Sequence, residues 1–180
     1  CGGGAAAGHH AGRAHGPASP CETKAREPGG VTVAPLSPEG FATATHVSRE
    51  TIERLTLYAD ALAKWQSRIN LVGPSTMSDV WRRHFLDSAQ ILPWLGRSVV
   101  DLGSGAGFPG LVVAIMTGKP VTLVESDQRK CAFLREAARI TGAAVQIIAA
   151  RIESVAGLKA DTVTARALAV PGTPFLTLAS

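Results

Sequence analysis

A run of glycines between Asp101 and Gly110 is the part of the sequence best suited to binding a small molecule. The run reads Asp-Leu-Gly-Ser-Gly-Ala-Gly-Phe-Pro-Gly and follows a short β-branched stretch. Glycines at the end of a strand let the chain turn sharply and let a ligand approach the backbone closely. A helix that follows such a turn presents free N–H groups to the ligand. The sequence therefore predicts a ligand-binding loop here.

Two binding patterns overlap in this loop. Gly105, Gly107 and Gly110 spell G-x-G-x-x-G, and Glu125 follows at the distance where an acid binds a ribose hydroxyl, which leaves a nicotinamide-dependent oxidoreductase open. The second pattern adds Asp101 at the end of the strand. A carboxylate there would repel a pyrophosphate but tolerates the sulfonium and amino groups of S-adenosylmethionine. Asp101 thus favours S-adenosylmethionine, although it could also be a structural cap on loop amides.

Carboxylates also follow the next two predicted strands. Glu125 ends the second strand, where it could bind both ribose hydroxyls, and Glu153 follows the third. Glu153 could accept a hydrogen bond from the adenine amino group while Ile152 packs on the ring. Taken singly, Glu125 could be a solvated loop acid and Glu153 an exposed acid at a helix start. Acids after three successive strands together predict one cofactor lying across the strand ends.

Strands and helices alternate in the segment that must position these residues. Strands are predicted at 98–102, 121–125, 145–148 and 161–165, and helices at 109–117, 127–140 and, as a short turn, 151–156. This alternation with apolar strands indicates an α/β core, residues 96–180, built on a parallel sheet covered on both faces. A further helix is expected to begin near Pro174.

The segment before this core has a different composition. Residues 1–45 are rich in Gly, Ala and Pro, and are expected to be a disordered extension. Residues 46–95 are predicted to form helices that pack on the core. One runs from a cap at Ser48 to about Ile69, with apolar residues at three- and four-residue steps, and a second runs from about Ser78 to Leu92.

Charge and cysteine usage narrow the function classes. The formal net charge of +4 is compatible with a polyanionic partner. Basic residues gather at 82–84 and 129–139, although each group could be a solvated helix face. The three cysteines are far apart, Cys131 is expected to be a reduced core residue, and no metal site is expected. No membrane span or signal peptide is recognised, which favours a cytoplasmic protein.

Four segments in the same order carry a resemblance to one family. They are Trp-Gln-Ser-Arg-Ile-Asn-Leu at 65–71, Arg-His-Phe-Leu-Asp-Ser at 83–88, the glycine run at 101–110, and Thr-Ala-Arg-Ala at 164–167. Over residues 47–172 the chain resembles the bacterial small-subunit ribosomal RNA guanine-N7 methyltransferase family, also called glucose-inhibited division protein B.

The resemblance implies a fold, an activity and a set of binding residues. The family has a class I, Rossmann-like methyltransferase fold and transfers a methyl group from S-adenosylmethionine to N7 of a guanine in 16S ribosomal RNA. The partner implied is that RNA or the small ribosomal subunit, and a monomer is expected. The residues that match the family's cofactor positions are Gly103, Phe108, Ile152, Glu153 and Arg166, and Asp101, Gly105 and Glu125 match general class I positions.

The sequence departs from the family in the number of strands. A class I methyltransferase sheet normally has seven strands, whereas four are predicted here, so the sheet is expected to be incomplete at its C-terminal end. A truncated chain that retains affinity for the cofactor or RNA without turnover therefore stays open. Because guanine N7 already carries a lone pair, catalysis is expected to rest on positioning, and no catalytic residue is assigned.

Overall fold

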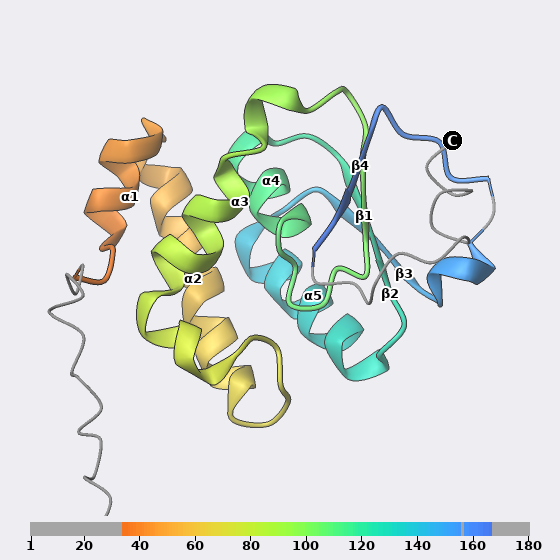
Figure 1. The fold of residues 1–180 in the computed structure, drawn as a ribbon, viewed down its shortest axis with the longest axis horizontal. Coiled ribbons are helices and arrows are strands. Elements are labelled where there is room, and N and C mark those ends of the chain that lie inside the picture. The colour runs from red at the N-terminus through yellow and green to blue at the C-terminus, as the bar shows by residue number, and fades with distance from the viewer. Residues whose placement is uncertain (1–33, 156, 167–180) are drawn as a thin grey trace, which may run out of the picture. The chain divides into compact units, whose positions relative to one another are not determined.

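The four strands of the computed structural model form one parallel sheet (Figure 1). The structure describes residues 34–155 and 157–166. The strands are β1 (Val99–Leu102), β2 (Val121–Glu125), β3 (Val145–Ala149) and β4 (Thr162–Ala165). Their order across the sheet is β3-β2-β1-β4, which is the start of the doubly wound order. The predicted α/β fold of the Rossmann-like class is confirmed, and the four predicted strands are present.

Most described helical residues lie before the sheet or between its first strands. The bounds are α1 (Pro38–Thr45), α2 (Arg49–Gln66), η1 (Pro74–Asp79), η2 (Trp81–Leu86), α3 (Asp87–Ala89), η3 (Leu92–Trp94), α4 (Gly110–Thr117), α5 (Gln128–Thr141) and η4 (Ile152–Ser154). Ser48 caps α2, as predicted. Asp127 caps α5, and Gly142 follows its last residue in the left-handed conformation.

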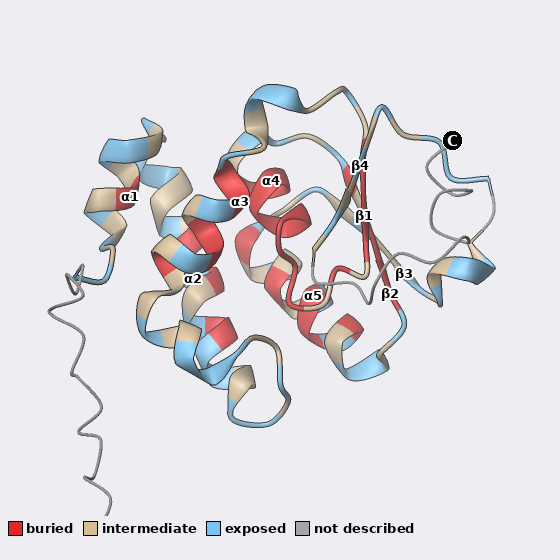
Figure 2. Ribbon diagram, viewed as in Figure 1, coloured by how far each residue is buried: buried red, intermediate tan, exposed pale blue. Residues whose placement is uncertain are grey.

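The larger core lies on the face of the sheet that α4 and α5 cover. Val99, Val121 and Leu123 point into it from the strands. Helix α4 is buried along most of its length, and α2 packs on α4 and α5 from outside, as the buried positions in Figure 2 show. The opposite face carries a smaller cluster of Val100, Leu102 and Val124. Coverage of both faces by helices was predicted, but the long helices among the described residues lie on one face only.

Helix α1 corrects the expected boundary of the N-terminal extension. The composition of residues 38–45 predicts disorder, yet these residues form a helix. The side chain of Ser37 accepts the Gly40 N–H, and Pro38 occupies the first turn, where its missing N–H costs nothing. Phe41 is fully buried, with its ring 5.4 Å from that of Trp81. Residues 1–33 lie outside the described residues, as does the helix expected near Pro174.

The second predicted N-terminal helix is also different from the expectation. The stretch expected to be one α-helix over 78–92 is helical, but it changes from a 3-10 turn to a π-helical turn and then to a single α-helical turn. Trp81 and Phe85, which the spacing predicts on the buried face, are buried in the π-helical turn, so the predicted apolar face is present although the type of helix changes along the stretch. The predicted short helix after β3 is the 3-10 turn η4.

The structure describes the surroundings of Cys131 and the length and apolar character of the helices. Cys131 is buried and free, and its thiol donates a hydrogen bond to the carbonyl oxygen of Glu125, as expected of a reduced core residue. In the part of the chain that the structure describes, no helix has the length and apolar character needed to cross a membrane.

Candidate cofactor-binding site

A cavity of about 670 Å³ opens at the carboxyl ends of the strands. Its walls include residues that directly follow each strand, among them Gly103 after β1, Ser126 after β2, Ala150 after β3 and Arg166 after β4. The order of the strands reverses between β1 and β4, and open α/β sheets bind ligands at such a crevice. The topology alone therefore marks this edge as the binding edge.

Seven of the eight residues predicted to bind the cofactor line this cavity. They are Gly103, Gly105, Phe108, Glu125, Ile152, Glu153 and Arg166. The eighth, Asp101, lies beneath the loop and does not contribute to the walls. Residues from three loops and from η4 thus converge although they are up to sixty-three positions apart in the chain, from Gly103 to Arg166.

The glycine loop has no room for side chains at two of its positions. Gly107 has a φ of 94°, and a Cβ there would lie 2.8 Å from the hydroxyl oxygen of Tyr58. A Cβ on Gly110 would lie 2.5 Å from Cδ2 of Leu123, because α4 begins directly against β2. These positions of the G-x-G-x-x-G pattern are therefore explained by the packing of the loop and helix, whatever ligand binds above them.

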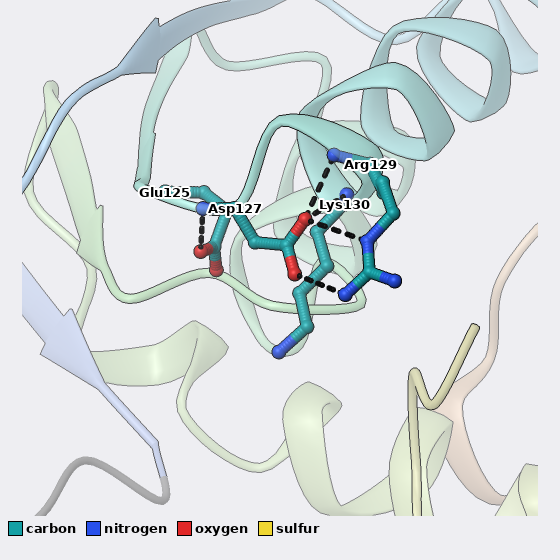
Figure 3. A network of polar contacts seen from close by, with 4 residues as sticks. All are labelled: Glu125, Asp127, Arg129 and Lys130. Carbon is teal, nitrogen blue, oxygen red and sulfur yellow. Dashed lines mark hydrogen bonds and ion pairs between the residues drawn. The ribbon is translucent and has the colours of Figure 1, made fainter.

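Glu125 holds the loop after β1 and the loop after β2 together. Its side chain accepts a hydrogen bond from the Gly105 N–H at 2.8 Å through one oxygen and from the Asp127 N–H at 2.8 Å through the other. Figure 3 shows the second of these bonds beside the cap of α5. The residue is 7% exposed and lines the cavity. Each carboxylate oxygen keeps a further lone pair for a ligand hydroxyl.

Asp101 caps a backbone amide, which is the structural role that the sequence left open as an alternative to ligand binding. It is fully buried, and its carboxylate accepts the Gly110 N–H at 3.2 Å and the Thr164 hydroxyl at 2.8 Å. Burial raises the pKa of Asp101 to about 6, although these hydrogen bonds act in the opposite direction. Asp101 thus joins β1 to β4 and caps the start of α4.

The start of α4 is a poor site for a phosphate. The Gly110 N–H is bound by Asp101, and the Leu111 N–H donates to the Gly107 carbonyl oxygen at 2.8 Å. A pyrophosphate needs free amides at this helix end and no carboxylate beside them. The geometry therefore argues against the dinucleotide reading of the glycine pattern.

Arg166, His84 and Phe108 form a stacked group on one wall. The guanidinium of Arg166 lies 5.5 Å from the centre of the Phe108 ring, and the ring of His84 stacks on the same residue at 4.8 Å. Arg166 also pairs with Asp87 at 3.1 Å and contacts Nδ1 of His84. The segment 83–88, which contains His84, is one of the four segments that carry the resemblance, but the sequence assigns it no role.

The partners of His84 define its protonation. A guanidinium only donates hydrogen bonds, so Nδ1 of His84 accepts from Arg166 and the ring proton resides on Nε2. Nε2 then donates to the Thr76 hydroxyl at 2.7 Å, which donates to the Gly73 carbonyl oxygen at 2.7 Å. Burial and the charge of Arg166 lower the pKa of His84 to about 4, so the ring is neutral at neutral pH.

One wall of the cavity was missed by sequence reasoning. The segment 70–74 lines it, and the side chain of Gln66 fixes this segment by accepting the N–H groups of Leu71 and Val72 at 3.0 and 3.1 Å. Part of the segment belongs to the quoted Trp65–Leu71 run, but its residue types carry no recognisable ligand chemistry. Ser104, Lys130 and Arg151 also line the cavity without having been predicted to bind the cofactor.

The cavity carries both signs of charge. Glu125 and Glu153 contribute carboxylates, while Lys130, Arg151 and Arg166 contribute cations. Such a wall suits a ligand with separated positive and negative groups together with hydroxyls. Among the described residues, no group of three or more His, Cys, Asp or Glu side chains is placed to hold a metal ion.

Comparison with known proteins identifies related sequences. Residues 51–175 match the family described as rRNA small subunit methyltransferase G. A protein of Paramagnetospirillum magneticum named ribosomal RNA small subunit methyltransferase G is 63% identical over 137 residues, covering 74% of this chain and 67% of the relative. Proteins of the same name from Gluconobacter oxydans and Rhodospirillum rubrum are 57% and 56% identical, covering 69% and 74% of this chain and 66% and 68% of the relatives.

The matches cover only part of each relative's length. The chain spans about two thirds of the length of the curated relatives it matches. Among solved structures, a mutant of MtNAS in complex with S-adenosylmethionine matches with a TM-score of 0.49 and 18% identity over 80% of this chain and 63% of that chain. A likeness at that level of identity and overlap indicates neither the ligand nor the activity of this chain.

Proposed function

This chain belongs to the rRNA small subunit methyltransferase G family, and from that membership we propose that it binds S-adenosylmethionine and methylates N7 of a guanine in 16S ribosomal RNA. The observation that carries the proposal is the convergence of Glu125, Glu153 and Arg166 on one cavity at the carboxyl ends of the strands. The RNA, alone or in the small ribosomal subunit, is the proposed substrate. We propose that the enzyme acts as a monomer in the cytoplasm, where ribosomal RNA is found.

The residues of the cavity fit the parts of the cofactor. Glu125, with a spare lone pair on each oxygen, would accept the ribose hydroxyls. Ile152 would pack on the adenine ring while Glu153 accepts its amino group. Arg166 would pair with the cofactor's carboxylate, since a guanidinium matches that group in two hydrogen bonds. When bound, the cofactor supplies an electrophilic methyl group.

The chain's own residues would act by positioning. Guanine N7 attacks with a lone pair that is free at neutral pH, so no proton has to be removed first. His84 agrees with this, because Nδ1 accepts from Arg166 and Nε2 donates to Thr76, which leaves no free lone pair for a base. The stacked Phe108, His84 and Arg166 then act as a fixed wall for the reacting groups.

A methyl-transfer assay tests the proposal. The chain is incubated with S-adenosylmethionine labelled in its methyl group and with 16S RNA from cells that lack this modification, and the product is mapped by chemical cleavage at N7-methylguanine. The proposal predicts label at one guanine. Label in another base or in none would contradict it, and binding of S-adenosylmethionine without transfer would favour a chain that keeps the cofactor site without turnover.

A further inference from the structure

Positive charge is concentrated where the C-terminal half of α2 packs along α5. Two surface hollows of about 430 and 490 Å³ lie over this contact. The ring of Trp65, which lines the second hollow, packs against the buried ring of Phe133 with their centroids 5.8 Å apart, and this contact joins the two helices. The hollows contain two acids, Asp127 and Glu136, and six cations: Lys64, Arg68, Arg129, Lys130, Arg135 and Arg139. We call these six cations and the hollows between them the α2–α5 basic surface.

Four of the six cations are available to a partner. Arg129 pairs with Asp127 at 3.2 Å and Arg139 pairs with Glu136 at 2.8 Å. The other four, Lys64, Arg68, Lys130 and Arg135, form no ion pair within residues 34–155 and 157–166. In Figure 3 the Lys130 side chain extends away from the Asp127 carboxylate that binds Arg129. The excess of four positive charges equals the formal net charge of the whole chain, which is +4.

The basic surface is continuous with the cofactor cavity. Arg68 lines both hollows, so they adjoin each other. Asn70 and Lys130 line the first hollow and also the cavity at the strand ends. A bound polyanion that follows the hollows would therefore arrive at the edge of the cavity where a methyl group is to be transferred.

Resting on the proposed function, we propose that the α2–α5 basic surface binds the phosphate backbone of the RNA beside the target guanine. Unpaired arginines suit phosphates because the guanidinium presents a fork of donors to two oxygens. A membrane surface is the weaker candidate, because surface helices that bind lipid also need exposed apolar anchors. The large exposed apolar residues among those described are Leu57, Trp94, Leu158 and Val163, and none lines either hollow.

Two double variants of equal charge change test the proposal. Arg68→Gln with Arg135→Gln removes two unpaired cations of the surface. Arg97→Gln with Lys159→Gln removes two exposed cations near the amino ends of the strands, which also form no ion pair among the described residues. Binding of unmodified 16S RNA to each full chain is measured by filter retention at several salt concentrations. Calorimetry with S-adenosylmethionine and a thermal melt accompany each variant.

The surface variant is expected to bind RNA about tenfold or more weakly, with a salt dependence reduced by about 1–2 in the log–log slope, while the control matches the parent chain. The proposal would be overturned if both variants bound RNA with the affinity and slope of the parent chain, or if both lost affinity equally. It would also be overturned if the parent chain did not bind RNA. Loss of binding to phosphatidylglycerol vesicles in the surface variant with RNA binding unchanged would overturn it as well.

The same measurements separate this proposal from the proposed function. If the parent chain binds S-adenosylmethionine and methylates RNA but the surface variant does so equally well, only the surface assignment fails. If RNA binding depends on the surface but S-adenosylmethionine does not bind, the methyltransferase function fails and the RNA surface stands.

Discussion

The hydroxyl of Tyr58 donates a hydrogen bond to the carbonyl oxygen of Ala106, so a residue of α2 holds the glycine loop from beneath. The ring of Tyr58 stacks on Phe108 at 5.3 Å, and its hydroxyl fills the space that a Cβ on Gly107 would need. Burial holds the pKa of Tyr58 well above its usual value, so the hydroxyl stays protonated and remains a donor. The N-terminal helices thus shape the cavity although α2 itself does not line it.

The variant Tyr58→Phe isolates this hydrogen bond. It keeps the ring but leaves the buried Ala106 carbonyl without its partner, which costs about 1–3 kcal/mol in the free energy of unfolding. We expect this loss together with weaker S-adenosylmethionine binding, measured by denaturant melts and calorimetry. The matched control is Thr56→Val, which removes a hydroxyl that bonds only within α2. An unchanged dissociation constant in Tyr58→Phe would show that the loop does not depend on Tyr58.

The two cavity carboxylates are expected to respond differently to amide substitution. Glu125→Gln puts an NH₂ group where one carboxylate oxygen now accepts a backbone N–H, so both stability and cofactor affinity should fall, with stability falling by about 1–3 kcal/mol. Within residues 34–155 and 157–166, Glu153 accepts no backbone N–H, and its side chain is 57% exposed. Glu153→Gln should therefore lower affinity for S-adenosylmethionine at unchanged stability. Identical melting and binding curves for the two variants would contradict the roles given to them.

Arg54 is predicted to be a stability residue away from the site. Its guanidinium donates to the carbonyl oxygens of Thr141 and Gly142 at the end of α5 and of Ile115 in α4. Arg54→Met keeps the stem but leaves these helix-end carbonyls without their donor, and should cost about 1–3 kcal/mol in unfolding free energy. The control Arg49→Met loses only an exposed pair with Glu53 and should melt like the parent chain. Equal melting temperatures for both variants would refute the prediction.

The stability of the fold should depend on pH through His84 and Asp101. The pKa of His84 is lowered from 6.5 to about 4, so its contribution is present above pH 6.5 and is lost as the pH falls toward 4. The pKa of Asp101 is raised from 3.8 to about 6, so its contribution is present at low pH and is lost as the pH rises through 6. The two dependences oppose each other in the range between.

The variant His84→Asn separates the two effects. Asparagine keeps an acceptor for Arg166 but does not titrate, so the stability advantage of the parent chain should shrink by about 1–2 kcal/mol between pH 7 and pH 4.5. The variant should also become more stable on mild acidification relative to the parent. Urea melts of both chains across this range measure the difference, and a difference that stays constant with pH would contradict the assignment of a neutral, buried His84.

Most of the sheet and its binding edge could be predicted because their signals are local. The β-branched strands, the cap at Ser48 and the acids after successive strands lie in short stretches of sequence. Helix α1 could not be predicted from composition, because it depends on one buried side chain, Phe41, whose partner Trp81 is forty positions away. The wall at 70–74 was missed for a similar reason, since the side chain of Gln66 defines it through backbone contacts.

Asp101 shows how a correct pattern can carry two readings. The spacing of Asp101 from the glycines is typical of class I cofactor sites, but spacing does not reveal whether a carboxylate faces the ligand or the backbone. Here it faces Gly110 and Thr164. Asp101 still disfavours a phosphate-containing ligand, because its carboxylate occupies the Gly110 N–H that a phosphate would need. Hydrogen-bond partners sixty-three positions away, as with Thr164, have no local signature in the sequence.

Calorimetric titration of the chain with S-adenosylmethionine, and separately with NAD⁺, decides directly which of the two ligands the cavity binds. We expect saturable binding of S-adenosylmethionine at one site and no heat of binding with NAD⁺, because the α4 amides are already engaged. Binding of NAD⁺, or no binding of S-adenosylmethionine by a chain that shows a cooperative thermal transition, would contradict the assignment of this cavity as a methyl-donor site.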